Sequence, residues 1–271
     1  AKLGLDGWVA PMTCYFNWMR YDYRRPNIER MLAMAHDEGA SGAVSYAVHD
    51  PGYTDHEALL AGYAWSGMAS GSMDEVQARW AECFGAGQEA YLAASEALVK
   101  VATAYPALGH CYHYTYTYCS KDLPWPRGYP AEALDKLAAM KGVKVAAQLR
   151  EAAELATQAG AGFAAVAAAP GLNETAKAAA KSLRAEAARA AGLATVFAFL
   201  VDLRKAKPKP DAAETCAALR AEFVEAMRVV ELNKPSYVAP SCLYSLSVLL
   251  EFLDQLHGDL KAGKAPRWAK E

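Results

Sequence analysis

Residues 1–66 alternate between short apolar runs of strand character and segments with helical periodicity. The run Gly7–Phe16 is strand-like, and a helical pattern follows over Asn27–Glu38 until the glycines of Gly39–Gly42 end it. A second apolar run, Ala43–Val48, leads through a loop into a helical pattern that ends at Trp65. This order predicts two β/α units from the end of a β/α barrel. Two units cannot close a sheet, so we expect most of the barrel to lie outside this chain.

Length and charge exclude several classes of function. The chain has 271 residues, enough for a sizeable core, and a formal net charge of −2. This charge gives no electrostatic argument for binding nucleic acid or an anionic membrane. No apolar run approaches the ~20 residues of a membrane span, and no signal peptide is visible, although an upstream segment could have been removed. The six cysteines are scattered, which is typical of ordinary thiols.

Beyond Gly71 the sequence becomes rich in alanine and takes on helical periodicity. An irregular aromatic stretch is expected at 110–130, and the stretch 160–171 fits either a helix or a tight buried turn. The fold class predicted is mainly α, with a partial β/α (TIM-type) barrel end at residues 1–70 and a helical bundle domain at 71–271. Helices are predicted from Met73 to about Phe84, Gln88 to Tyr105, Pro130 to Gln158, Asn173 to Lys205, Asp211 to Leu232 and Pro240 to Leu260.

Four stretches of this sequence resemble the C-terminal part of family 20-type glycoside hydrolases, the β-N-acetylhexosaminidase group. Gly7–Asp22 is similar to the seventh barrel strand with its aromatic loop, and Gly39–Asp50 is similar to the eighth strand. Ala58–Trp65 resembles the closing helix, and Glu231–Ser236 resembles a turn of the form N-[KR]-P before a final helix. The resemblance covers the first quarter of the chain well and the helical remainder loosely.

The resemblance implies substrate-assisted hydrolysis, in which the acetamido oxygen of the sugar attacks the anomeric carbon. In the family an adjacent Asp–Glu pair orients the acetamido group and supplies the general acid, at the end of a strand expected upstream of residue 1. Asp37-Glu38 has the same letters but ends a helix, so we interpret it as a solvated turn. Gly67 stands where the family commonly has a glutamate for sugar hydroxyls. The isolated chain is therefore expected to be inactive.

Candidate sugar-binding residues follow from the rule that β/α barrels bind substrates at the C-terminal ends of their strands. Tryptophans there can stack on a pyranose ring, a tyrosine can hydrogen-bond the acetamido oxygen, and aspartates can accept bonds from sugar hydroxyls. The alternative is that the aromatic side chains only pack the barrel against the helices. An acid in the loop before Pro51 has no such packing purpose. The predicted substrate-binding residues are Tyr15, Trp18, Asp22, Tyr46, His49, Asp50 and Trp65.

Two clusters raise the question of a metal site. His49 and His56 flank a loop that contains two aspartates, and the segment 109–119 carries His110, Cys111, His113 and Cys119 among alternating tyrosines. Neither spacing is a specific metal signature, and the tyrosine segment fits an amphipathic connector packed against the helices. We therefore expect no metal and no cofactor.

The most favoured function is part of a carbohydrate-active hydrolase that acts on N-acetylhexosaminides. Its expected partners are the carbohydrate substrate and the missing N-terminal barrel portion, with no nucleic acid and no membrane. The alternative is a non-catalytic helical interaction or scaffold protein whose exposed first strand pairs with a partner chain. A third option is another glycosidase family, with its nucleophile supplied upstream.

Overall fold

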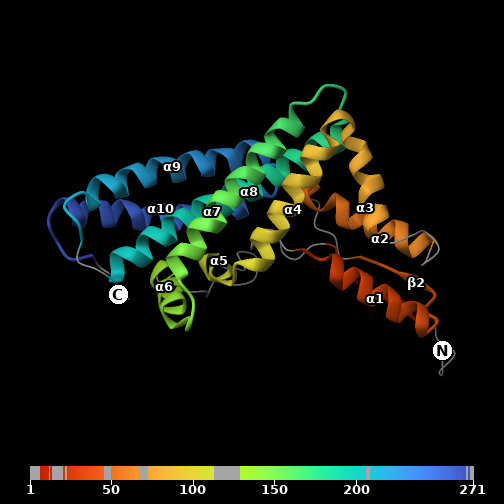
Figure 1. The fold of residues 1–271 in the computed structure, drawn as a ribbon, viewed down its shortest axis with the longest axis horizontal. Coiled ribbons are helices and arrows are strands. Elements are labelled where there is room, and N and C mark those ends of the chain that lie inside the picture. Colours follow the sequence, from red (N-terminus) through yellow and green to blue (C-terminus); the bar gives the residue numbers. More distant parts are fainter. Residues whose placement is uncertain are drawn as a thin grey trace.

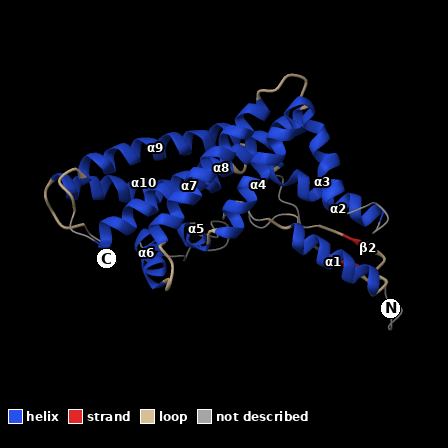
Figure 2. Cartoon of the chain, in the orientation of Figure 1, coloured by secondary structure: helices blue, strands red, loops and turns tan. Residues whose placement is uncertain are grey.

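The chain is mostly helical in a computed structural model, as the sequence predicts (Figure 2). The long helices lie side by side at one end of the molecule, and the two short strands lie at the other end with the first helices (Figure 1). The structure describes residues 7–11, 13, 21, 23–45, 50–66, 73–112, 129–205, 208–266 and 268.

The N-terminal segment is a strand–helix–strand–helix unit. Strand β1 pairs in parallel with β2, with Trp8 opposite Gly42 and Val9 opposite Ala43. A parallel pair needs a crossover connection, and helix α1 lies within it. The elements are β1 (Trp8–Val9), α1 (Arg25–Asp37), β2 (Gly42–Ala43), the 3₁₀ helix η1 (Pro51–Tyr53) and α2 (Thr54–Ser66).

Local chemistry explains the bounds of these elements. Pro26 occupies the first turn of α1, where its missing N–H costs no intrahelical bond, and Gly39 ends the helix with a φ of +68°. Asp50 caps η1, its side chain accepting the Gly52 N–H, and the Thr54 hydroxyl donates to the Pro51 carbonyl at 2.8 Å. The strands are shorter than predicted, and part of each predicted run lies outside the described residues.

The helical part is built around one long central helix, α8, which packs most extensively against α7 and α9. With 32 residues it is about 48 Å long. The helices are α3 (Met73–Ala81), the 3₁₀ helix η3 (Glu82–Gly87), α4 (Gln88–Ala104), α5 (Pro106–Cys111), α6 (Tyr129–Ala139), α7 (Val145–Ala167), α8 (Glu174–Lys205), α9 (Ala212–Asn233) and α10 (Ala239–Lys261).

Most predicted helix bounds are confirmed, with two corrections. Asn173 caps α8 as expected, its side chain accepting the Ala176 N–H at 2.8 Å. The single helix predicted over 130–158 is two helices, because Gly142 takes a φ of +72° between α6 and α7.

The stretch from 160 to 167 is helical, which excludes a tight buried turn there. Helix α5 replaces the start of the predicted irregular stretch at 110, since Pro106 opens a short helix. The predicted domain boundary near residue 70 lies outside the described residues.

The N-terminal segment shares hydrophobic cores with the helical part. A small cluster beneath the strands joins α1 and α2 to Val76 of α3. Tyr53 of η1 is fully buried in a second cluster, against α4, α7 and α8. Because η1 follows β2 and packs on α8, the loop after β2 is held against the central helix.

Helices α4 and α7 approach closely at a glycine, which leads to a stability prediction. A Cβ placed on Gly162 would lie 2.8 Å from the Ala94 Cβ, so any side chain there forces the two helices apart. We expect Gly162→Val to lower the free energy of unfolding by about 1–3 kcal/mol. Adding Ala94→Gly should recover part of this loss, whereas Ala161→Val, an exposed position on the same helix, should have little effect. Urea unfolding of the four chains measures the effect, and an unchanged Gly162→Val midpoint would contradict the close approach.

Candidate functional site

The carboxyl ends of the two parallel strands point toward the helical part of the molecule. Parallel strands place these ends at one edge, and the two following loops are tied together there. The Thr13 and Ser45 hydroxyl oxygens are 2.8 Å apart, and the His56 Nδ1 lies 2.8 Å from the Thr13 carbonyl oxygen. The loop after β2 then reaches Asp50, which is buried against α8 and the turn between α9 and α10. Ligands of parallel α/β proteins bind at this edge.

A buried group of charged residues joins this loop to the helical part. We call it the junction cluster, and its members are Asp50, Ser182, Glu186, Arg189 and Lys234. The Lys234 Nζ donates to the Asp50 Oδ2 at 2.6 Å and to the Ser182 Oγ at 2.9 Å. The Asp50 Oδ1 accepts bonds from the Gly52 N–H, at 2.9 Å, and from the Ser182 hydroxyl. One lysine at the α9–α10 turn thus connects α8 to the loop after β2.

Glu186 and Arg189 extend the cluster along α8. The Glu186 Oε1 lies 2.8 Å from the Lys234 Nζ and 3.6 Å from the Arg189 Nη1. Within the described parts of the chain neither oxygen of this carboxylate has a well-aligned hydrogen-bond donor, so its attraction to Lys234 and Arg189 is mainly electrostatic. Arg189 also donates to the Cys242 Sγ at 3.3 Å and lies 5.0 Å from the centre of the Tyr112 ring. Two anions and two cations balance one another in a volume closed to water.

The pKa shifts within the cluster follow from this pairing. Burial alone would raise the pKa of Asp50, but the Lys234 ammonium and the hydrogen bonds to the carboxylate outweigh burial and hold it below its usual value. Burial would likewise lower the pKa of Lys234, and the Asp50 and Glu186 carboxylates raise it instead. Both groups are therefore charged near neutral pH, and the pair is an ionic contact rather than a proton donor and acceptor.

Of the predicted sugar-binding residues, the described part of the chain contains Asp50 and Trp65. Asp50 is 2% exposed and both of its oxygens are hydrogen-bonded, whereas Trp65 is 93% exposed. They lie near opposite ends of α2, which separates them by about 16 Å along its axis. The structure therefore does not bring these two onto one sugar ring. Tyr15, Trp18, Asp22, Tyr46 and His49 lie outside the described residues.

Sequence reasoning missed the cluster partners of Asp50. Glu186 and Arg189 sit in a helix whose other buried positions are almost all small or apolar. A charged residue at a position that the helical periodicity assigns to the core is unusual, and this signal could have identified Glu186 and Arg189 from the sequence. Lys234 lies in the N-K-P turn already noted for its resemblance, but its partner could not be identified from the sequence.

His56, considered above as a metal ligand, is fully buried among aromatic rings. Its ring is 5.6 Å from that of Tyr53 and 5.9 Å from that of Tyr23, measured between centroids. Its Nε2 has no hydrogen-bond partner among the residues that the structure describes. No group of three or more metal-ligating side chains is found among the described residues, and His49, the other proposed ligand, lies outside them. Cys111 is buried in α5, and burial raises the pKa of its thiol.

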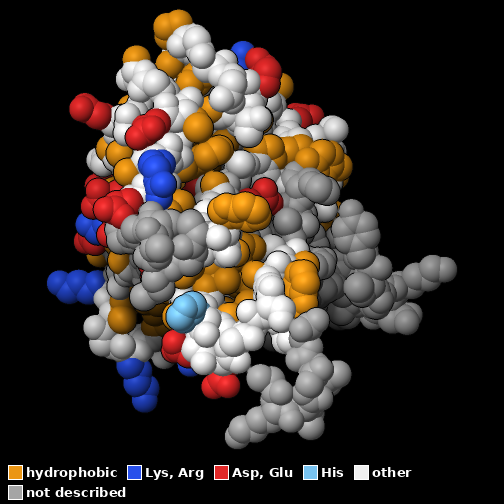
Figure 3. Space-filling view, turned by 90° about the vertical axis from the view of Figure 1, so that its right-hand side faces the viewer, with side chains coloured by type: hydrophobic (Ala, Val, Ile, Leu, Met, Phe, Trp, Pro, Cys, Tyr) orange, Lys and Arg blue, Asp and Glu red, His pale blue; other side chains and the backbone are white. Residues whose placement is uncertain are grey.

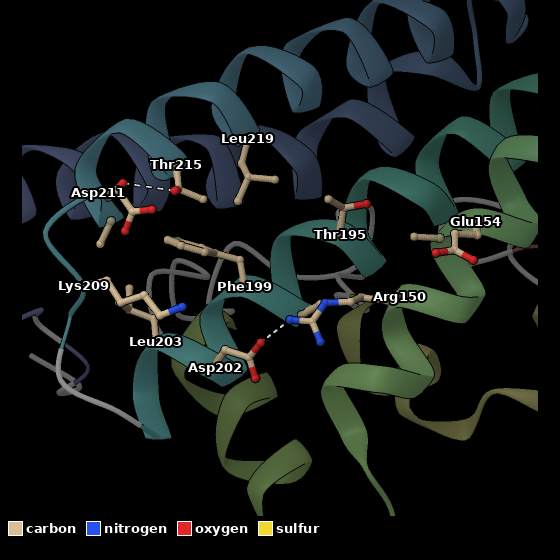
Figure 4. A pocket seen from close by; sticks show the side chains of 13 residues that line it. Arg150, Glu154, Thr195, Phe199, Asp202, Leu203, Lys209, Asp211, Thr215 and Leu219 are labelled. Carbon is tan, nitrogen blue, oxygen red and sulfur yellow. Dashed lines mark hydrogen bonds and ion pairs between the residues drawn. The ribbon is translucent and has the colours of Figure 1, made fainter.

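A cleft of about 510 Å³ lies away from the strands, between α7, α8 and the start of α9 (Figure 4). Phe199 and Leu219 face it, and the guanidinium of Arg150 points at the carboxylate of Asp202, with which it is paired. The rim therefore carries charges of both signs, and its arginine is already neutralised by a neighbour. The cleft shares no residue with the junction cluster.

None of the described helices has both the length and the apolar character that crossing a membrane requires. Searches against family models, curated proteins and solved structures find no match to this chain.

Proposed function

We propose that this chain supplies the final two β/α units and the helical support of a carbohydrate-active hydrolase that acts on N-acetylhexosaminides. The observation that carries the proposal is the parallel β1–β2 pair, its crossover helix and its open outer face. The substrate class comes from the resemblance to the β-N-acetylhexosaminidase group set out above. The catalytic Asp–Glu pair would come from strands outside residues 1–271.

The open face of the strands supports association with further strands. Val9 and Ala43 pack toward α1 and α2, so the alternation of side chains places Trp8 and Val44 on the other face. Trp8 is 64% exposed and Val44 is 54% exposed. Hydrophobic side chains gather across this end of the molecule (Figure 3). Parallel sheets are normally covered on both faces. An uncovered apolar face is therefore what we expect of two strands that belong to a larger sheet.

The junction cluster supports a role for the helical part at the substrate edge. It fixes the loop after β2 against α8 and the α9–α10 turn, at the edge where parallel β/α proteins bind ligands. In this proposal the cluster positions the pocket wall and the predicted residues of the two loops contact sugar, whereas Trp65, at the other end of α2, lies away from this edge. Asp50 would then position the pocket wall and not contact the sugar itself, because Lys234, Ser182 and Gly52 occupy its two oxygens.

Sugar binding and reconstituted hydrolysis test the proposal. Isothermal titration of the chain with the methyl β-glycoside of N-acetylglucosamine should show weak binding, and the methyl β-glycoside of glucose should show none. The isolated chain should not hydrolyse a chromogenic N-acetyl-β-glucosaminide, and mixing it with the N-terminal barrel portion of a family 20-type enzyme should produce hydrolysis. Hydrolysis by the isolated chain would show that the catalytic pair lies within it.

A non-catalytic scaffold is the second candidate, and the outer edges of the two strands favour it. Within the described residues β1 and β2 pair only with each other, so their outer edges are available to a partner strand. A scaffold would bind such a strand but no sugar. Absence of any heat of binding with the N-acetylated glycoside, together with capture of a partner strand, would favour this candidate over the hydrolase.

A further inference from the structure

The central helix α8 is covered along most of its length but is open along one line. Between residues 182 and 201 every residue of α8 is buried except six. All six line a groove between α7 and α9: Arg184, Ala188, Ala191, Gly192, Thr195 and Phe199. A helix at the centre of a bundle is normally covered all round, so this open line is a place for a further element.

The groove consists of two hollows that meet. One is the cleft of about 510 Å³ at the start of α9, and the other, of about 390 Å³, continues it along α8. Thr195 and Leu219 line both hollows. On α7 the lining extends from Arg150 to Ala164, which corresponds to about 21 Å of helix. The groove is therefore longer than one small molecule needs and matches about four turns of a helix.

The spacing of the open positions on α8 also favours a helix as the occupant. Arg184, Ala188, Ala191 and Thr195 follow one another at intervals of four, three and four residues. This is the spacing at which a helix presents a seam to a second helix in a coiled coil. The side chains in the middle of the seam are small, so the groove has room there for large apolar side chains of the occupant.

Acidic side chains stand on both walls near the place where the two hollows meet. Glu154 extends from α7, and α9 with Glu222 forms the opposite wall (Figure 4). Neither carboxylate has an ion-pair partner among the described residues. The unpaired cations of the lining lie at its ends, Arg184 at one and Lys209, close in sequence to Asp211, at the other. The middle of the groove is thus complementary in charge to basic residues on both flanks of an apolar stripe.

We propose that this groove binds an amphipathic helix of a partner protein, with large apolar residues at intervals of three and four and with lysine or arginine on both flanks. A second copy of this chain fits less well. Two such grooves face to face would leave the hollow unfilled, and none of the described helices displays a row of exposed large apolar residues. The inference goes beyond the proposed function, because the groove shares no residue with the strands or the junction cluster.

A labelled model peptide tests the proposal. The probe is a fluorescein-labelled helix of about 18 residues, with leucine at heptad positions a and d, lysine at e and g and alanine elsewhere. The control peptide carries glutamate in place of lysine. Fluorescence anisotropy with the full chain should show that the lysine peptide binds at least about tenfold more tightly than the glutamate peptide.

Two tryptophan variants locate the binding. Ala161→Trp places a large ring on the α7 wall at an exposed position, and it should weaken binding of the lysine peptide at least about tenfold. Ala221→Trp is the control at an exposed alanine of α9 outside the groove, and it should stay within about twofold of the parent chain. Equal thermal unfolding midpoints should confirm that both variants fold like the parent chain.

A pair of charge variants separates complementarity from apolar contact. Glu154→Gln combined with Glu222→Gln should weaken binding of the lysine peptide roughly threefold to tenfold. Glu151→Gln combined with Glu231→Gln, at exposed positions of the same two helices outside the groove, should stay within about twofold.

Three results would overturn the inference and leave the proposed function standing. The first is that the lysine peptide does not bind, or binds no better than the glutamate peptide. The second is equal affinity of the parent chain and Ala161→Trp. The third is a dimer of the parent chain in sedimentation equilibrium that Ala161→Trp dissociates, which would identify a second copy as the occupant.

Discussion

Lys234→Met is expected to lower the free energy of unfolding by about 3–5 kcal/mol, the usual cost of removing one partner from a buried ion pair. Lys234 has a fully buried side chain whose ammonium lies 2.6 Å from Asp50 and 2.8 Å from Glu186. Methionine fills a similar volume but leaves two carboxylates facing each other without their shared cation. For a chain of this size the loss corresponds to a fall in melting temperature of roughly 10 °C.

Thermal and urea unfolding of matched variants test this expectation. Lys136→Met is the control, because Lys136 is exposed on α6 and its replacement should change little. Combining Lys234→Met with Asp50→Asn removes the one excess negative charge, while Glu186 stays paired with Arg189, and should recover part of the lost stability. Equal melting temperatures for Lys234→Met and the Lys136 control would show that the junction cluster does not stabilise the fold.

Local sequence signals predicted the helices well because the determinants lie within a few residues of each boundary. Asn173 marks the start of α8 through one side-chain bond to a backbone N–H three residues away. The predictions failed where competing signals overlap. Gly142 interrupts an otherwise helical pattern, and its positive φ shows that the chain turns there. The helix predicted to end at Tyr105 is followed at once by α5, because Pro106 occupies its first turn and proline opens helices.

The candidate site was less predictable because its contacts are distant in sequence. Asp50 was predicted to bind sugar because a loop acid has no packing purpose, but its carboxylate is buried and binds Ser182, 132 residues away, and Lys234, 184 residues away. Periodicity and composition contain no information on such pairings. The sequence therefore predicts which side chain is unusual, whereas the fold decides whether it faces a ligand or a buried lysine.

Asp50→Asn is expected to loosen the N-terminal segment selectively. Asparagine keeps an oxygen near the Gly52 N–H but loses the charge that pairs with Lys234, at a cost of about 3 kcal/mol. Because Asp50 joins the loop after β2 to α8, the amides of η1 and α2 should exchange faster with deuterium. The amides of α8 should keep their protection, since that helix packs along its length on α7 and α9.

The pH dependence of stability provides an independent measure of the same contact. The pKa of Asp50 is lowered in the folded chain, so its stabilising effect is complete above about pH 4 and is lost as the pH falls through the folded-state pKa. The difference in melting temperature between the parent chain and Asp50→Asn should therefore be constant near neutral pH and shrink below pH ~4. Asp37→Asn, at an exposed carboxylate that ends α1, should show no such convergence. A difference that persists unchanged at low pH would mean that the carboxylate charge is not what holds the loop, and that Asp50 acts through its shape and neutral hydrogen bonds alone.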